Sequence, residues 1–340
     1  MELEITKKID SPRLKEAWKK MEQARGVSSF LYYDYMRFIW QQEKRFSAYT
    51  PVVACVMEGD EYLMLIPLKW DMFKRRYKML GDIMGCGHAD ALFNEKSCLQ
   101  ERQQCVAFFY SHIGHHLKLS RIPEDSLLLQ ATGMPNDSMQ SVDLVRISFN
   151  DGVDALIKSL SRNGKESIRR AYNRMRRDGV EPELRIFKGN ENSIDDETWK
   201  VIMQIYLDRL DAKHKRGGKK GKGNRLYRFI YDWKNRHLKH DTKSLRKLPN
   251  NLHAVLMHKG KVMAFCLCMM DHHGECLANP RLAINDEYTF YSPGYVLLTE
   301  LMRYLEKETQ CRLLDLSRGC EQYKMNLGGK VYRTFQVVRN

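Results

Sequence analysis

Apolar residues along this chain follow two different periods, and the period predicts which segments are helices and which are strands. Spacings of three and four residues predict helices, whereas short apolar runs bounded by turn residues predict strands. In the first 145 residues the pattern predicts helices over residues 13–25, 32–46 and 98–117, and strands over residues 51–57, 62–70 and 142–149. Residues 58–61 contain Gly59 and have the length of a hairpin loop. We therefore expect one small α/β unit in this part of the chain.

The second part of the chain repeats this mixture with different element lengths. The pattern predicts a helix that begins near residue 151, helices over residues 162–178, 196–211, 226–238 and 294–307, and strands over residues 183–188, 252–258, 261–270, 275–284, 312–316 and 330–338. A chain of 340 residues is long enough for two domains of average size. We therefore expect a mixed α/β (α+β) protein with domains at residues 1–145 and 146–340.

The predicted helix over residues 162–178 combines an apolar face with a dense set of arginines. Its apolar residues follow the i, i+3, i+4, i+7 spacing of one buried face: Ile168, Ala171, Tyr172 and Met175. The arginines lie on both flanks of this face, so packing would hold them in place. Arg169 and Arg170 are our candidates for binding an anionic group, because a guanidinium group can bind phosphate or carboxylate at two points.

The positive charge of the chain is local. The chain has 57 Lys and Arg against 42 Asp and Glu, a formal net charge of +15. Residues 162–177 carry seven Lys or Arg against one Glu, and residues 213–247 carry fourteen against two Asp. Clustered charge of one sign indicates a polyanionic partner such as a phosphorylated cofactor, a nucleic acid or an anionic membrane surface. A solvated helix face and a mobile basic insertion near residues 212–224 form the alternative interpretation.

Composition excludes several classes of protein. The apolar run at residues 263–270 is too short to cross a bilayer, and the N-terminus lacks the pattern of a signal peptide. Nine cysteines cannot all pair, and those at 55, 266, 268, 276 and 311 lie in apolar, strand-like runs. We therefore expect a cytoplasmic protein in a reducing compartment, with no transmembrane segment and no metal.

Residues 291–294 lie between a predicted strand and a predicted helix. Ser292 is at a plausible N-cap position and Pro293 follows at the first helical position, where its missing N–H costs nothing. Gly294 allows a ligand to approach the next turn closely. Free backbone N–H groups and the positive end of the helix dipole make this turn a candidate site for a pyrophosphate, and a well-formed helix start is the alternative.

A second cluster of polar residues follows the apolar strand that ends near Asp315. Glu321, Tyr323 and Lys324 lie within the next nine residues. Acid and base groups that converge after a strand are typical of active sites in α/β folds. A solvated turn with an ion pair is the alternative at this point.

These blocks together resemble a known family. Leu160-Ser161-Arg162 with Arg169-Arg170-Ala171 and Gly179, then residues 291–298, then residues 314–316 with residues 319–324, are similar to the CelD-type branch of the GNAT acyltransferase superfamily, and the element order of residues 153–338 resembles an acetyltransferase domain. The family's tandem build, shared with Fem-type peptidyltransferases, implies two GNAT-like domains, each with a mixed, mostly antiparallel sheet flanked by helices. The first would be a degenerate copy. The Arg/Gln-x-x-Gly-x-Gly/Ala signature of many GNAT proteins is absent, and the Ser-Pro-Gly turn stands in its place.

The resemblance implies an N-acyltransferase that moves an acyl group, in the simplest case acetyl, from acyl-CoA to an amine. Such a reaction needs a base for the ammonium, a polarised thioester carbonyl and an acid for the leaving thiolate. We expect Glu321 or Asp315 to act as base and Tyr323 as acid. Lys324 nearby would favour negative charge, and with Arg169 and Arg170 it is a candidate residue for binding the substrate or an anion. The predicted donor site is Ser292, Pro293, Gly294, Tyr295 and Val296.

Two other functions are alternatives to transfer from acyl-CoA. A Fem-like transferase would use aminoacyl-tRNA, and the basic segments would then bind the nucleic acid. A non-catalytic, basic RNA-binding protein on a GNAT scaffold is the other alternative. The expected partners are therefore a small or polymer-linked amine, with tRNA and peripheral contact with an anionic membrane surface as further candidates.

Overall fold

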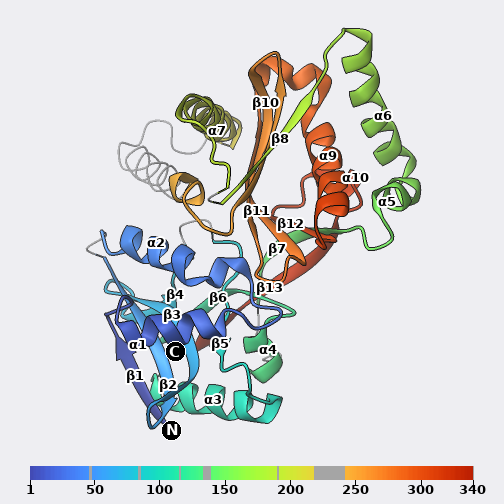
Figure 1. The fold of residues 1–340 in the computed structure, drawn as a ribbon. Coiled ribbons are helices and arrows are strands. Elements are labelled where there is room, and N and C mark those ends of the chain that lie inside the picture. Colours follow the sequence, from blue (N-terminus) through green and yellow to red (C-terminus); the bar gives the residue numbers. More distant parts are fainter. Residues whose placement is uncertain are drawn as a thin grey trace. The chain divides into compact units, whose positions relative to one another are not determined.

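The computed structural model describes residues 1–45, 48–82, 86–114, 116–132, 139–189, 191–217 and 242–339, which form two compact units (Figure 1). The first unit is Met1–Leu144 together with Tyr332–Asn340, and the second is Val145–Val331. The chain leaves the first unit within strand β7 (Met139–Ser148) and returns to it within strand β13 (Lys330–Arg339). The last strand therefore belongs mainly to the first unit.

The first unit is a sheet with helices. Its helices are α1 (Pro12–Met21), α2 (Tyr33–Glu43), α3 (Leu99–His112) and α4 (Leu127–Thr132), with the 3-10 turn η1 (Ser29–Leu31). Its strands, besides the two that cross the boundary, are β1 (Glu2–Thr6), β2 (Tyr49–Glu58), β3 (Glu61–Asp71), β4 (Arg76–Met79), β5 (Leu92–Phe93) and β6 (Leu117–Pro123). The strands β1, β2, β3 and β4 pair antiparallel in this order, β4 pairs parallel with β6, and β6 pairs antiparallel with β13.

The second unit is built in the same way. Its helices are α5 (Val153–Ser159), α6 (Arg162–Arg177), α7 (Asp196–Gly217), α9 (Pro293–Glu308) and α10 (Gln322–Asn326), with the 3-10 turn η2 (Asp286–Tyr291). Its strands are β8 (Glu183–Lys188), β9 (Leu252–His258), β10 (Lys261–Met270), β11 (Cys276–Ile284) and β12 (Leu313–Arg318). The strands β8, β9, β10 and β11 pair antiparallel in this order, and β11 pairs parallel with β12.

The two units share one topology. In each, a first strand leads through a helical segment to three further antiparallel strands, and the last of these four strands pairs parallel with a strand that follows a helix. The crossover helix is α3 in the first unit and α9 in the second. A parallel neighbour requires such a crossover connection, because a hairpin can only join antiparallel strands. The expectation of a mixed, mostly antiparallel α/β fold is confirmed.

Each unit has its own apolar core. In the second unit Ile168, Ala171 and Met175 of α6 pack in one buried cluster with Leu297 and Leu301 of α9, and Tyr172 packs partly buried against it. The predicted apolar face of α6 is therefore confirmed. In the first unit the buried cluster is formed by residues of β2, β3, α3 and α4 with two residues of β13.

Most predicted elements are present, and the errors have identifiable causes. The strands predicted at 183–188, 252–258 and 261–270 match β8, β9 and β10 residue for residue. The helix predicted over 98–117 is wrong in its last turn, because α3 ends at His112, Gly114 takes a φ of 82°, and residues 117–123 form β6. Strands β1, β4 and β5 and helices α4 and α10 were not predicted, because two to six residues give too short a pattern.

The predicted basic loop is partly a helix. Helix α7 continues to Gly217, so residues 212–217 are helical, whereas a mobile basic insertion was expected near residues 212–224. The remainder of that segment and the helix predicted over residues 226–238 lie outside the described residues. Within the part of the chain that the structure covers, no helix is long and apolar enough to cross a membrane and no group of three His, Cys, Asp or Glu side chains is placed to hold a metal ion.

Candidate active site

The central feature of the second unit is a parallel strand pair that ends early. Strands β11 and β12 are paired only at Cys276↔Leu313, Leu277↔Leu314 and Ala278↔Asp315. Strand β11 then continues for six residues to Ile284, and over this length it stays paired with β10. Since all residues of both strands are described and no later pair joins them, the two strands part after Asp315. Beyond Ala278, the edge of β11 that faces β12 is therefore not paired with that strand.

A β-bulge lies on β11 where the two strands part. Leu267 is opposite Arg281 and Met269 is opposite Ala278, so β11 has one residue more than β10 between these pairs. The extra length falls at Asn279 and Pro280. A bulge explains how a central strand accommodates a proline, which has no N–H for the ladder, and bulges commonly re-aim backbone groups beside active sites.

Asn279 has an unsatisfied polar atom at this position. Its side chain is buried, with 4% of its surface exposed, and its Nδ2 lies 3.4 Å from the Sγ of Cys266. The side-chain oxygen has no hydrogen-bond partner among the described residues. A buried amide oxygen without a partner is costly and indicates a place where a ligand or a water supplies the missing hydrogen.

The N-terminus of α9 follows this opening. Ser292 is at the N-cap position, as expected, and Pro293 is the first helical residue, but the serine hydroxyl does not cap the helix. Ser292 instead has a left-handed backbone, with φ and ψ both at 52°, and its carbonyl accepts a hydrogen bond from Tyr295 N at 3.1 Å. Among the described residues the Ser292 side chain makes no cap bond here, so part of the N–H groups and the positive end of a 16-residue helix are available to an anion.

Space is open beside Gly294. A β-carbon added there would meet only the Cγ2 of Ile284, at the ordinary contact distance of 3.6 Å. The side chain of Val296 is fully buried, so only the backbone of this residue can reach a ligand. Tyr295 is partly exposed, and its hydroxyl accepts a hydrogen bond from Nδ2 of Asn326 at 3.0 Å.

Asp315 is fully buried at the end of the paired part of β12. Its Oδ1 accepts a hydrogen bond from Ser317 N at 2.7 Å, and its Oδ2 lies 3.5 Å from the Nε of Arg146. Ser317 has a left-handed backbone, with φ at 54°, and Gly319 follows at 97°. The carboxylate thus holds a turn that L-residues adopt at a cost. This geometry favours a positioning role for Asp315 over the predicted role as base.

Lys324 is buried beneath the same turn. Its Nζ donates hydrogen bonds to the carbonyl oxygens of Leu316 at 3.0 Å, Arg318 at 2.8 Å and Gly319 at 2.9 Å, and forms a 3.0 Å ion pair with Glu321. An ammonium group has three hydrogens to donate, and these acceptors occupy all of them. Burial lowers the pKa of Lys324, and the charge of Glu321 opposes this effect. The geometry therefore favours a structural role over the predicted contact with an external anion.

Glu321 and Tyr323 lie close together at the start of α10. Burial alone would raise the pKa of Glu321, but the hydrogen bond and charge of Lys324 outweigh it and hold that pKa below its ordinary value. Burial, and then the charge of Glu321, raise the pKa of Tyr323, so its phenol stays protonated and can donate a hydrogen bond. Arg209 of α7 and Tyr295 of α9 also act electrostatically on Tyr323. Residues from α7, α9 and α10 thus meet here.

The arginines of α6 fall into two groups. Arg169 and Arg170 are exposed by 68% and 56% of their side chains and pair with Glu166 on the same helix. Arg174 instead donates a 2.6 Å hydrogen bond to the carbonyl oxygen of Phe290 and stacks 4.7 Å above its ring. Phe290 belongs to η2, and η2 ends directly before Ser292. Arg174 therefore holds the segment that leads into α9.

Sequence reasoning missed three residues of this site: Arg174, Asn279 and Ser317. The signal for Asn279 was present, because Asn-Pro-Arg interrupts an apolar strand and a proline in a central strand requires a bulge. The signal for Arg174 was only its place among other arginines. Nothing in the sequence distinguishes Ser317, whose left-handed backbone follows from its hydrogen bond to Asp315.

The first unit differs from the second at the corresponding position. Strands β4 and β6 are paired at Tyr77↔Leu117 and Lys78↔Lys118. Beyond this pair, the carbonyl of Arg121 on β6 accepts a hydrogen bond from Ala89 N at 3.0 Å, and its Nη1 donates to the carbonyl oxygen of Cys86 at 2.9 Å. Described residues of the segment that follows β4 are therefore hydrogen-bonded to β6.

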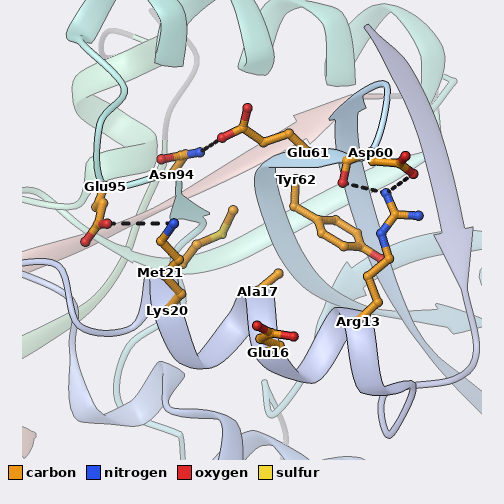
Figure 2. Close-up of a pocket in the computed structure, with 10 residues that line it drawn as sticks. All are labelled: Arg13, Glu16, Ala17, Lys20, Met21, Asp60, Glu61, Tyr62, Asn94 and Glu95. Atoms are coloured by element: carbon orange, nitrogen blue, oxygen red, sulfur yellow. Dashed lines mark hydrogen bonds and ion pairs between the residues drawn. The ribbon is translucent and has the colours of Figure 1, made fainter.

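A surface groove of about 220 Å³ is also present in the first unit (Figure 2). It lies between α1 and the β2–β3 turn, and Figure 2 shows Arg13 paired with Asp60, Lys20 with Glu95 and Asn94 with Glu61. Arg13 pairs with Asp60 at 2.9 Å and lies over the ring of Tyr62, and Asn94 donates to Glu61 at 2.6 Å. Its ten lining residues all belong to the first unit.

Residues 162–325 match the acetyltransferase (GNAT) domain family. The chain contains a GNAT acetyltransferase domain. The match covers α6 to α10, and so includes the parted strands, the N-terminus of α9 and the Glu321–Lys324 turn. None of the curated proteins matches this sequence.

Several solved structures are similar to the whole chain. The C-terminal domain of a candidate lysylphosphatidylglycerol synthetase from Agrobacterium fabrum is 13% identical with a TM-score of 0.58, over 96% of this chain and 91% of that one. A conserved protein of unknown function from Bacteroides thetaiotaomicron is 10% identical with a TM-score of 0.55, over 98% and 97%. L-PGS from Bacillus licheniformis is 12% identical with a TM-score of 0.55, over 97% and 92%. At these identities the matches show a common fold.

Proposed function

We propose that the GNAT domain is an N-acyltransferase that moves an acyl group, in the simplest case acetyl, from acyl-CoA to an amine. The observation that carries this proposal is the parting of β11 and β12 after three paired residues, followed in the chain by the uncapped N-terminus of α9. An extended donor can bond to the free edge of a strand while its pyrophosphate binds the helix N-terminus.

The residues around α9 fit such a donor. The N–H groups of Gly294 and Val296 would bind the pyrophosphate, and the open space beside Gly294 would admit it. Ser292 and Pro293 would orient this end of the helix, the first through its left-handed backbone. The unpartnered oxygen of Asn279 lies on the strand that the pantetheine arm would follow.

The transfer needs two proton steps, and α10 carries a group for each. The amine must lose a proton before its nitrogen bonds to the thioester carbonyl carbon, and Glu321 would take this proton through a water. The C–S bond then breaks, and Tyr323 would give its proton to the departing thiolate. Asp315 and Lys324 would hold the turn on which Glu321 stands. The phenol would be reprotonated from solvent in the next step.

The first unit would act as a degenerate GNAT copy. The shared topology supports this proposal, and so does the hydrogen bonding to β6 of described residues of the segment that follows β4. We accordingly propose one donor site per chain. The nine free cysteines and an acyl-CoA donor fit a cytoplasmic reaction.

A second candidate function is transfer of an aminoacyl group from aminoacyl-tRNA. The observation that favours it is the exposed arginine face of α6, where Arg169, Arg170 and Arg176 lie in solvent. The named function of two structural relatives, lysylphosphatidylglycerol synthesis, also fits an aminoacyl donor. In that case the arginine face would bind tRNA phosphates.

Titration with acetyl-CoA and with aminoacyl-tRNA across a salt series separates these functions. An acyl-CoA enzyme should show one saturable site for acetyl-CoA with a shallow salt dependence. A tRNA-dependent enzyme should instead lose tRNA affinity steeply as salt rises, because each phosphate contact releases counterions. The first proposal fails if acetyl-CoA does not bind, and a basic RNA-binding protein without activity would bind tRNA but transfer nothing.

A further inference from the structure

The turn between β3 and β4 exposes two large apolar side chains side by side. Phe73 is 83% exposed and Met72 is 56% exposed, and Phe73 is the most exposed large apolar residue among those described. Isolated exposed apolar residues are normal on protein surfaces, whereas adjacent ones at the tip of a hairpin are a recognised feature of interaction sites.

The tip is held firmly. Asp71 at its base is buried, and its Oδ1 accepts hydrogen bonds from the backbone N–H groups of Phe73 and Lys74, both at 3.0 Å. Its Oδ2 forms a 2.6 Å ion pair with Lys78, and Met72 N donates to the carbonyl of Ala48 at 3.0 Å. Burial would raise the pKa of Asp71, but these hydrogen bonds hold it below its ordinary value. The exposure of the tip is therefore fixed by its turn and is not a sign of a frayed segment.

Basic residues directly follow the apolar pair. Lys74 and Arg75 are exposed and Arg76 is partly exposed, and Arg75 has a left-handed φ of 47°. Behind the tip, Trp70 of β3 and Tyr77 of β4 pack edge to face, with ring centroids 4.8 Å apart. The acid of this hairpin, Asp71, is buried and paired with Lys78. The outer end of the hairpin thus combines apolar side chains, cations and an aromatic pair.

We propose that the β3–β4 hairpin docks the protein onto an anionic lipid bilayer. Met72 and Phe73 would enter the boundary between headgroups and acyl chains, and Lys74, Arg75 and Arg76 would lie against the lipid phosphates. Apolar insertion and electrostatic attraction are each weak alone and together give stable peripheral binding. Trp and Tyr side chains favour the headgroup level, where the Trp70–Tyr77 pair would lie.

A bilayer fits this surface better than a nucleic acid. Binding of single-stranded nucleic acid combines a basic groove with aromatic side chains that stack on bases, whereas this site is a protruding tip. Met72 is a flexible thioether and offers no flat face for stacking. The proposal does not depend on the acyl transfer proposed above, because the hairpin belongs to the first unit and the GNAT domain to the second.

Flotation of the full-length protein with vesicles tests the proposal. We expect binding to vesicles of phosphatidylcholine with phosphatidylglycerol, no binding to phosphatidylcholine alone, and weakening as salt is raised. The double variant Met72→Ser, Phe73→Ser should lower the apparent affinity about tenfold or more. Lys74→Gln and Arg75→Gln should each lower it about fivefold.

Matched controls keep the test decisive. Leu99→Ser removes another exposed apolar side chain, and Lys7→Gln with Lys8→Gln removes two exposed charges elsewhere in the first unit; both variants should bind as wild type. Phe73→Trp should keep binding, and its fluorescence should shift to the blue on anionic vesicles. Equal binding of wild type and tip variants, or the absence of binding to anionic vesicles, overturns the proposal. Loss of RNA binding in the tip variants with unchanged vesicle binding would assign the tip to a nucleic acid instead.

Discussion

A β-carbon added at Gly164 would lie 2.2 Å from the carbonyl oxygen of Asn326. Gly164 is in the first turn of α6 and Asn326 ends α10, the helix that carries Tyr323. The glycine therefore allows α10 to lie directly against α6, and no residue with a side chain fits without moving backbone. This contact links the arginine-rich helix to the proposed catalytic residues.

We expect Gly164→Ala to destabilise the protein although alanine is the better helix former. Alanine would gain about 1 kcal/mol of helix propensity, whereas the overlap with Asn326 should cost about 1–3 kcal/mol or displace α10. Chemical denaturation should show the loss, and kcat should fall because Tyr323 moves with α10. Asn173→Ala, at an exposed position of α6, is the control. A Gly164→Ala protein as stable and active as wild type would show that α10 can move away from α6 without loss of stability or activity.

The Lys324–Glu321 pair should be a source of stability. Lys324→Met leaves three carbonyl oxygens without their donor and Glu321 without its partner. We expect a loss of about 3 kcal/mol, the lower end for a buried pair, because Glu321 is partly exposed. Urea denaturation of the variant measures it. An unchanged unfolding midpoint would refute the structural role and return Lys324 to the list of candidate anion-binding residues.

The same pair predicts a pH dependence. The pKa of Glu321 is lowered in the folded protein, so its contribution is present above its ordinary pKa of 4.5 and is lost as pH falls through the lower folded value. The stability difference between wild type and Glu321→Gln should therefore be constant near neutral pH and shrink below about pH 4.5. Denaturation curves at a series of pH values test this, and a difference that persists in acid would contradict it.

Tyr323→Phe should lower kcat about 10²- to 10⁴-fold while KM changes little, because the phenol acts as bonds break. The folded structure should survive, since the ring packs against the core and only a hydroxyl is removed. Steady-state kinetics with a thermal melt separates the two effects. If the variant is fully active, or inactive only because it is unfolded, water is the better candidate for the proton donor.

Gly294→Val should weaken binding of CoA at least tenfold without lowering stability. The added methyl groups would enter the open space in which we place the pyrophosphate, and within the protein the new β-carbon meets only Ile284 at 3.6 Å. Gly294→Ala should give a smaller effect in the same direction. Calorimetric titration with CoA gives both affinities. Equal affinities for wild type and both variants would remove the α9 N-terminus from the donor site.

Arg169→Lys and Arg170→Lys should each raise the KM for the anionic substrate severalfold. Lysine keeps the charge but loses the two-point guanidinium contact. Both side chains are accessible, and their exposed pairs with Glu166 contribute little stability, so a phosphate can displace them. Lys158→Arg on α5 adds a guanidinium without a predicted role and is the control. If both lysine variants have wild-type kinetics, this face of α6 is a solvated surface that does not bind the substrate.

The periodic elements and the apolar face of α6 could be predicted from sequence alone. Strands β9 and β10 are mostly apolar runs between turn residues, β8 begins by alternating charged and apolar residues, and α6 has four apolar residues on one face. In these elements local pattern and tertiary burial agree. The helix start at Pro293 could be predicted because proline at the first helical position is a local signal. Short elements such as β4 and α10 could not, since they are held by pairing and packing with distant residues.

The roles of the polar residues were decided by tertiary structure. The sequence places Asp315, Glu321 and Lys324 within ten residues but does not say which of them is buried. The end of β12 and the turn after it bring three carbonyl oxygens around the Lys324 ammonium and a backbone N–H onto the Asp315 carboxylate. These contacts favour a structural role for both residues. Likewise, Arg174 differs from Arg169 only in the residue that its guanidinium meets. Composition and order determine which groups a chain carries, whereas burial and hydrogen-bond partners, which arise only when distant segments pack, determine what each group can do.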